Sequence, residues 1–125
     1  MNKKAIYYED EHNSRPVEEF INELEPKAKA KVLARIEFLE EHWDELRRPY
    51  VDSLGDGLYE IRVIFSGNQI RILYAYMFKD YIVLLHGIIK KSKEVLRGDI
   101  LKAKNRIDNF QARYKQGNIR LPGLG

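Results

Sequence analysis

Residues 57–92 read GLYEIRVIFSGNQIRILYAYMFKDYIVLLHGIIKKS, and this stretch decides the fold. It contains three runs rich in Val, Ile, Tyr and Phe, which are separated by Ser66-Gly67-Asn68 and by Lys79-Asp80. β-branched and aromatic residues favour strands, and short polar breaks between such runs favour tight connections. The sequence therefore predicts three consecutive β-strands joined by tight turns.

The alternation of side chains predicts which face of these strands is buried. One face of the first strand is entirely apolar or aromatic and is predicted to face the core: Tyr59, Ile61, Val63 and Phe65. The other face carries Glu60 and Arg62, and Arg71 interrupts the second strand. Lys90 and Lys91 close the third strand, and parity alone does not decide which of them joins the arginines. Because a buried cation is costly unless it is paired, repeated strand cations predict a wet face that receives an anion.

The order of the remaining elements predicts an α+β domain. Residues 4–8 are predicted to form a short strand, and Asn13 or Ser14 can cap a helix that has Pro16 in its first turn. Pro26 ends this helix and begins a second one, which runs to about Trp43. Residues 46–57 are predicted to be a connection. The two helices are expected to cover the aromatic sheet face.

A last helix follows the three strands and is capped by Asp99 or Ser92. Its apolar residues step by four and three along one stripe: Leu96, Ile100, Ala103, Ile107, Phe110 and Tyr114. The predicted order is thus β-αα-βββ-α, with a mostly antiparallel twisted sheet packed against helices. We expect one domain over residues 1–114, and a tail without independent structure over residues 115–125.

Composition excludes several classes of protein. The chain has 125 residues and no cysteine, which fits one domain in a reducing compartment. Its three histidines, at positions 12, 42 and 86, have no metal-ligand spacing, and no Walker, GxGxxG or GxSxG pattern occurs, so neither metal nor cofactor is expected. The start is not a secretory signal, and no run approaches the roughly 18 apolar residues of a membrane span. We expect a cytoplasmic protein.

Charge is spread unevenly along the chain. Residues 1–45 hold seven Lys/Arg against twelve Asp/Glu, whereas residues 86–125 hold ten against three. A basic block beside strand cations favours a polyanion such as nucleic acid as the partner. The candidate RNA-binding residues in this block are Lys102, Lys104, Arg106 and Arg113. A basic helix with a solvated face explains the charge equally well.

The strand cations suggest a chemistry. Guanidinium forks match phosphate oxygens, and in RNA the 2′-OH supplies the nucleophile, so a protein need add only a proton acceptor, a proton donor and a cationic clamp. Glu60 lies on the same face as Arg62 and is a candidate acceptor, while a lysine whose pKa is lowered by crowded cations is a candidate donor. The alternative is that Glu60 and Arg62 form a surface ion pair. His86 is either a hydrogen-bonded core residue or catalytic.

The segments LYEIR, RILY and HGIIKK resemble the phage Gp49-like branch of the RelE/HigB toxins of type II toxin–antitoxin pairs, over about residues 4–113. The resemblance implies the RelE-like fold and a metal-independent, ribosome-dependent mRNA endonuclease that inhibits translation. Such an enzyme leaves a 2′,3′-cyclic or 3′ phosphate and a 5′-OH. Carried over to this chain, the active-site cations are Arg62, Arg71 and Lys91, with Lys90 next in line. The implied partners are the ribosome, mRNA and a cognate antitoxin with a helix-turn-helix domain.

The chain also departs from this family. RelE has a tyrosine shortly after the last strand cation, whereas SKEVLRGDI follows here, so the general acid and base are unassigned. The proline that the Gp49-like branch often has near this place is absent. A non-catalytic module that binds RNA or a protein through the same basic surface is therefore the competing interpretation, and a phage structural or regulatory protein that kept the fold is a third.

Overall fold

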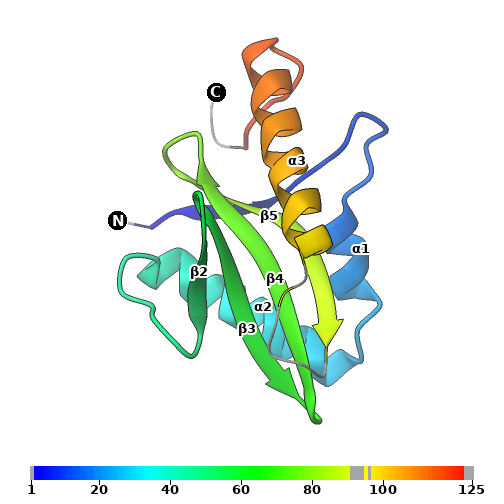
Figure 1. Ribbon diagram of the computed structural model, residues 1–125, viewed down its shortest axis with the longest axis vertical. Coiled ribbons are helices and arrows are strands. Elements are labelled where there is room, and N and C mark those ends of the chain that lie inside the picture. The colour runs from blue at the N-terminus through cyan, green and yellow to red at the C-terminus, as the bar shows by residue number, and fades with distance from the viewer. Residues whose placement is uncertain (1, 91–94, 96, 123–125) are drawn as a thin grey trace.

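The computed structural model describes residues 2–90, 95 and 97–122. In this part of the chain five strands form one twisted sheet in the order β1-β5-β4-β3-β2 (Figure 1). β1 pairs in parallel with β5, and all other pairs are antiparallel. The predicted α+β class and the mostly antiparallel sheet are therefore confirmed. The strand bounds are β1 (Lys4–Tyr7), β2 (Val51–Gly55), β3 (Leu58–Phe65), β4 (Asn68–Met77) and β5 (Tyr81–Lys90).

β2 corrects the predicted order of elements. Residues 46–57 were expected to be only a connection, but Val51–Gly55 pairs with β3 in the register Val51↔Ile61 and Asp52↔Glu60. The sequence VDSLG holds only two large apolar residues, so its strand character comes from the ladder with β3 and not from its own propensity. The extra strand matters because it places Asp52 beside Glu60.

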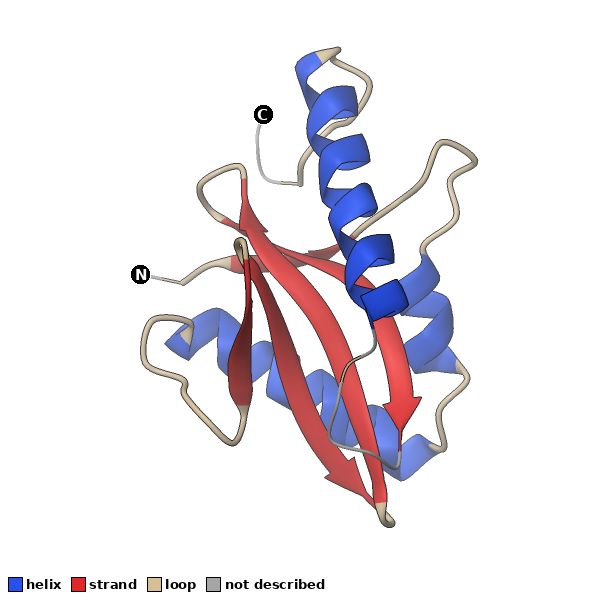
Figure 2. Cartoon of the chain, viewed as in Figure 1, coloured by secondary structure: helices blue, strands red, loops and turns tan. Residues whose placement is uncertain are grey.

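Two helices, α1 (Pro16–Asn22) and α2 (Pro26–His42), cover the aromatic face of the sheet, as predicted (Figure 2). Each begins at a proline, but neither has a side-chain cap, so the predicted cap at Asn13 or Ser14 is wrong. The Ser14 hydroxyl instead donates to Glu19. The buried core on this side consists of Val17, Ile21, Ala28, Val32, Ile36 and Leu39 from the helices and Val51, Ile61, Val63, Ile70, Ile72, Tyr74, Ile82 and Leu84 from the sheet.

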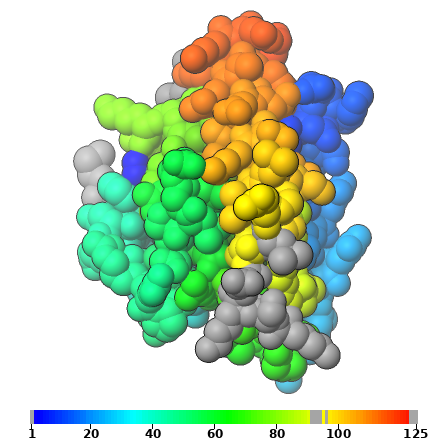
Figure 3. Space-filling view, viewed as in Figure 1, coloured from blue at the N-terminus to red at the C-terminus, as the bar shows by residue number. Residues whose placement is uncertain are grey.

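The third helix, α3 (Arg97–Lys115), crosses the opposite face, where it is seen on the surface (Figure 3). Beneath it lies a second core. Ala103 and Phe110 of the predicted stripe are buried against sheet residues that include Leu73, Val83 and Leu85. Leu96 and Ser92 lie outside the described residues, and Asp99 does not cap the helix but lies within its first turn. The segment after α3 has no helix or strand through residue 122, yet Leu121 is buried in the same core.

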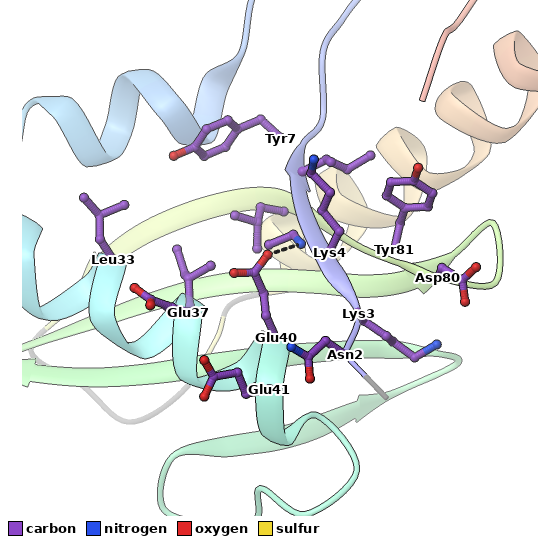
Figure 4. Close-up of a pocket in the computed structure, with 14 residues that line it drawn as sticks. Asn2, Lys3, Lys4, Tyr7, Leu33, Glu37, Glu40, Glu41, Asp80 and Tyr81 are labelled. Atoms are coloured by element: carbon purple, nitrogen blue, oxygen red, sulfur yellow. Dashed lines mark hydrogen bonds between the residues drawn. The ribbon is translucent and has the colours of Figure 1, made fainter. Parts of the chain in front are cut away.

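The free edge of β1 is closed by α2. Glu40 accepts hydrogen bonds from the backbone N–H groups of Lys3, through its carbonyl (3.0 Å), and of Ala5, through its carboxylate (2.8 Å; Figure 4). These contacts border a cavity of about 850 Å³ whose wall also carries Glu37 and Glu41. Its lining carries four carboxylates against the two lysines Lys3 and Lys4, so its net charge is negative and disfavours a phosphate group. No helix in the described residues is long and apolar enough to cross a membrane.

Candidate active site

The register of the sheet brings the strand cations together. Arg62 of β3 lies directly opposite Arg71 of β4, so the two arginines share a face, as the alternation predicted. In β5, Ile88 pairs with Arg71 and Lys90 pairs with Gln69. Lys90 therefore extends the same face, which answers the question that parity left open. Lys91 lies outside the described residues.

A buried carboxylate links the two arginines. Glu60 Oε1 accepts hydrogen bonds from Arg62 Nε (2.6 Å) and from Arg71 Nη1 (2.6 Å), and Arg71 Nη2 also donates to Gln69. Glu60 is only 1% exposed and Arg71 only 2%, so the expectation of a solvated face is wrong at these two positions. Burial is possible here because each charge has an opposite partner within hydrogen-bond distance.

Arg62 is the accessible member of this cluster, with its side chain 30% exposed. Its Nη2 donates to Asp52 of β2 (3.0 Å), and Arg48 contacts the same carboxylate (2.9 Å). The hydrogen bond from Arg48 holds the pKa of Asp52 below its usual range. Cations and carboxylates thus alternate from Arg48 at the surface to Arg71 in the interior. The surface ion pair that the sequence offered as an alternative for Glu60 and Arg62 is part of this partly buried network.

A second polar cluster connects β5 with the start of α3. His86 Nε2 lies 2.9 Å from Asp99 Oδ1, and Lys90 Nζ lies 3.2 Å from Asp99 Oδ2. Burial lowers the pKa of His86 below its usual 6.5, although the Asp99 carboxylate opposes this effect. Burial alone would raise the pKa of Asp99, but the hydrogen bonds of His86 and Lys90 outweigh it and lower that pKa. A neutral imidazole held by a carboxylate can accept a proton near neutral pH.

The geometry makes Glu60 a poor proton acceptor. Its Oε1 already accepts hydrogen bonds from two guanidinium groups, so this oxygen is not placed to take a proton from a substrate. Its Oε2 is buried without a hydrogen-bond partner among the described residues. Glu60 is therefore suited to fix the positions of Arg62 and Arg71, whereas His86 has the chemistry of a base.

The four basic residues predicted to bind RNA have different surroundings. Arg106 Nη1 donates to the Leu85 carbonyl (2.7 Å), and Arg113 Nη1 donates to the Glu9 carbonyl (2.6 Å), so both tie α3 to the rest of the fold. Burial also lowers the pKa of Arg106. Lys104 Nζ contacts Asp56 (2.7 Å), and Lys102 is exposed. The charges of Arg106 and Lys102 help to lower the pKa of His86, after the larger effect of burial.

Three polar partners in the site were missed from the sequence: Asp52, Gln69 and Asp99. Asp52 lies in a segment without a strand pattern, and Asp99 seemed to be a helix cap. The alternation did contain a signal for Gln69, because it shares strand parity with Arg71. No group of three or more His, Cys, Asp or Glu side chains in the described ranges could hold a metal ion.

A mostly antiparallel sheet with two helices on one face and cations on its strands is the architecture that the sequence resemblance implied. The chain belongs to the family described as Phage derived protein Gp49-like (DUF891), whose model matches residues 19–108. This family is a branch of the RelE/HigB-like toxins and is associated with toxin-type nucleases. A toxin of this kind implies an antitoxin as partner. Comparison with curated proteins finds no match.

Proposed function

We propose that this chain is the toxin of a type II toxin–antitoxin pair and a metal-independent, ribosome-dependent mRNA endonuclease that inhibits translation. One observation carries the proposal. Arg62 and Arg71 lie opposite each other on neighbouring strands, share the carboxylate of Glu60 and line the same cavity of about 440 Å³. Two guanidinium groups held by one carboxylate form a rigid clamp for phosphate oxygens.

In this proposal Arg62 makes the direct phosphate contact. Its Nε and Nη2 are committed to carboxylates, while a guanidinium carries five donor hydrogens in all, so hydrogens remain for a phosphate oxygen. Arg71 is almost fully buried, so it supports the phosphate with its positive charge and holds Glu60, which in turn holds Arg62. Lys90, the last residue of β5, adds positive charge, and Lys91 is the next residue in the sequence.

His86 is the proposed general base, and Asp99 orients it. His86 accepts the proton of the RNA 2′-OH, O2′ attacks the phosphorus, and the bond from phosphorus to O5′ breaks. The leaving O5′ takes a proton from a lysine, Lys90 or Lys91. The products are a 2′,3′-cyclic phosphate and a 5′-OH, so atoms and charges balance without a metal ion.

The partners proposed for this activity are the ribosome, mRNA and an antitoxin with a helix-turn-helix domain. Lys102 is the member of the C-terminal basic set best placed to contact ribosomal RNA, because it is exposed, while Arg106 and Arg113 are held by backbone carbonyls. The competing function is a non-catalytic module that binds RNA or a protein through the same cations.

The test is expression without an antitoxin, with growth followed and new 5′-OH ends mapped on isolated ribosomes. We expect the parent to arrest growth and cut mRNA. His86→Gln should slow cleavage by about 10²- to 10⁴-fold and Arg62→Gln by about 10²- to 10³-fold. Arg15→Gln is the matched control, because Arg15 is an exposed cation that pairs with Glu9 and Glu18 outside the site.

A folded parent that neither arrests growth nor produces 5′-OH ends would remove the enzyme and leave the binding module. If the parent cuts and the His86 and Arg62 variants cut equally well, the enzyme stands but this active site does not.

A further inference from the structure

A second set of cations lies at the free edge of β3. The cavity of about 440 Å³ that Arg62 and Arg71 line is bordered on its other side by Lys31 and Arg35 of α2 and by Tyr50. Its lining thus contains four cations and no carboxylate. Arg62 and Arg71 are paired with the carboxylates of Glu60 and Asp52, whereas Lys31 and Arg35 add positive charge to the wall, and this excess predicts an anionic ligand.

The edge exists because β2 is short. The ladder between β2 and β3 reaches only to the pair Val51↔Ile61, and just beyond it the Tyr50 carbonyl accepts the N–H of Arg62 (2.8 Å). From there to the end of β3 the outward carbonyls have no neighbouring strand in the described residues. They are taken by side chains of α2: Arg35 Nη1 donates to the Arg62 carbonyl (2.9 Å), and Lys31 Nζ donates to the Ile64 carbonyl (2.7 Å).

These backbone contacts fix the two cations of α2 without neutralising them. Lys31 and Arg35 are one helical turn apart and lie on the same side of α2. A lysine has three donor hydrogens and an arginine five, and each side chain gives only one donor atom to a carbonyl here. Both positive charges and several N–H donors are therefore held beside the cavity.

An aromatic ring completes this edge. Tyr50 is 47% exposed, and the Arg35 guanidinium carbon lies 4.6 Å from the centre of its ring. The side chain of Ile64, which is also exposed, borders the same cavity. Cations that follow a backbone together with an accessible aromatic ring are the combination by which proteins hold single-stranded nucleic acid.

We propose that Lys31, Arg35 and Tyr50 form a subsite for single-stranded RNA, in which Tyr50 stacks on a base and the two cations contact a flanking phosphate. The subsite rests on the proposed function in one respect: Arg62 and Arg71 on the shared cavity wall would hold the scissile phosphate, so the bound nucleotide is its neighbour. An acidic protein segment could pair with the cations but has no base to stack on the exposed ring. RNA can do both, with a phosphate on the cations and a base on the ring.

The experiment measures binding and not cleavage. A labelled RNA hexamer with 2′-O-methyl groups, which removes the nucleophile, is titrated with the purified protein, and fluorescence anisotropy is recorded at several salt concentrations. We expect Lys31→Gln/Arg35→Gln to weaken binding at least tenfold and to reduce the slope of log K against log salt by about 0.7, since about 0.7 is lost for each phosphate contact with a single strand and both cations contact the same phosphate. Tyr50→Ala should weaken binding about fivefold or more, and Tyr50→Phe should retain it.

Lys27→Gln/Lys29→Gln is the matched control, because it removes the same charge from α2 at positions that do not line the cavity. Thermal unfolding of every variant confirms that it is folded. The subsite is refuted if the parent does not bind the hexamer, if the control pair weakens binding as much as the Lys31/Arg35 pair, or if Tyr50→Ala binds like the parent. A parent that binds through these residues and yields no 5′-OH ends keeps the subsite while the proposed nuclease fails.

Discussion

Replacing Arg71 by methionine tests the buried network most directly. Arg71 is 2% exposed and its main partner Glu60 is 1% exposed, so Arg71→Met leaves a carboxylate in the interior with only Arg62 to compensate it. Removing one partner of a buried ion pair costs about 3–5 kcal/mol. Because Arg62 still donates to Glu60, we expect the lower end, about 3 kcal/mol. A domain of this size has a total stability of about 5–15 kcal/mol, so the variant should fold but unfold much earlier.

The assay is urea denaturation followed by circular dichroism, with Arg62→Met as the matched control. Arg62 is 30% exposed, and after its removal Glu60 keeps Arg71 and Asp52 keeps Arg48, so both carboxylates retain a cation. We expect this control to cost about 1 kcal/mol or less. The double variant Glu60→Leu/Arg71→Met should recover most of the loss, because an apolar pair of similar volume replaces both charges.

Two results would refute this reasoning. If Arg71→Met costs no more than Arg62→Met, the Glu60 carboxylate is solvated and the network is a surface feature, as the sequence alone suggested. If the double variant is no more stable than the worse single variant, the loss reflects packing and not an uncompensated charge. Cleavage rates of Arg71 variants therefore have to be compared at equal folded fractions.

Three further predictions address the base, the packing and the basic helix. Asp99→Asn removes the carboxylate that opposes the effect of burial on His86, so the pKa of His86 should fall further. The acidic limb of the pH–rate profile should then move to lower pH. A limb that stays in place would exclude His86 as the titrating base. Gly87→Ala should destabilise the domain by about 1–3 kcal/mol in urea denaturation, since a Cβ there clashes with the Phe20 ring, and adding Phe20→Leu should restore part of the loss. Lys102→Gln should flatten the salt dependence of ribosome association without moving the cleavage site. A cleavage site that moves in this variant would contradict the role of Lys102 as a phosphate contact.

The local pattern was sufficient to predict most of the architecture. Side chains alternate with period two in a strand, so the placement of Ile61 and Val63 on one face and Arg62 on the other followed from spacing alone. The prolines at positions 16 and 26 have no N–H to lose at the first helical turn, which is why both helix starts were predictable although their caps were not. The same alternation predicted that Arg62 and Arg71 share a face of the sheet.

What the sequence could not decide depends on contacts between distant segments. VDSLG is a strand only because β3 offers a ladder, and this strand brings Asp52 to Arg62. Strand parity predicts which face a side chain occupies, whereas its burial depends on what covers that face. The sequence therefore predicted solvated side chains for Glu60 and Arg71, but in the structure they are buried and paired with each other. Likewise, Asp99 meets His86 and Arg35 meets the edge of β3 only across the packed elements, because side chains 13 and 27 residues apart have no fixed distance until the chain folds.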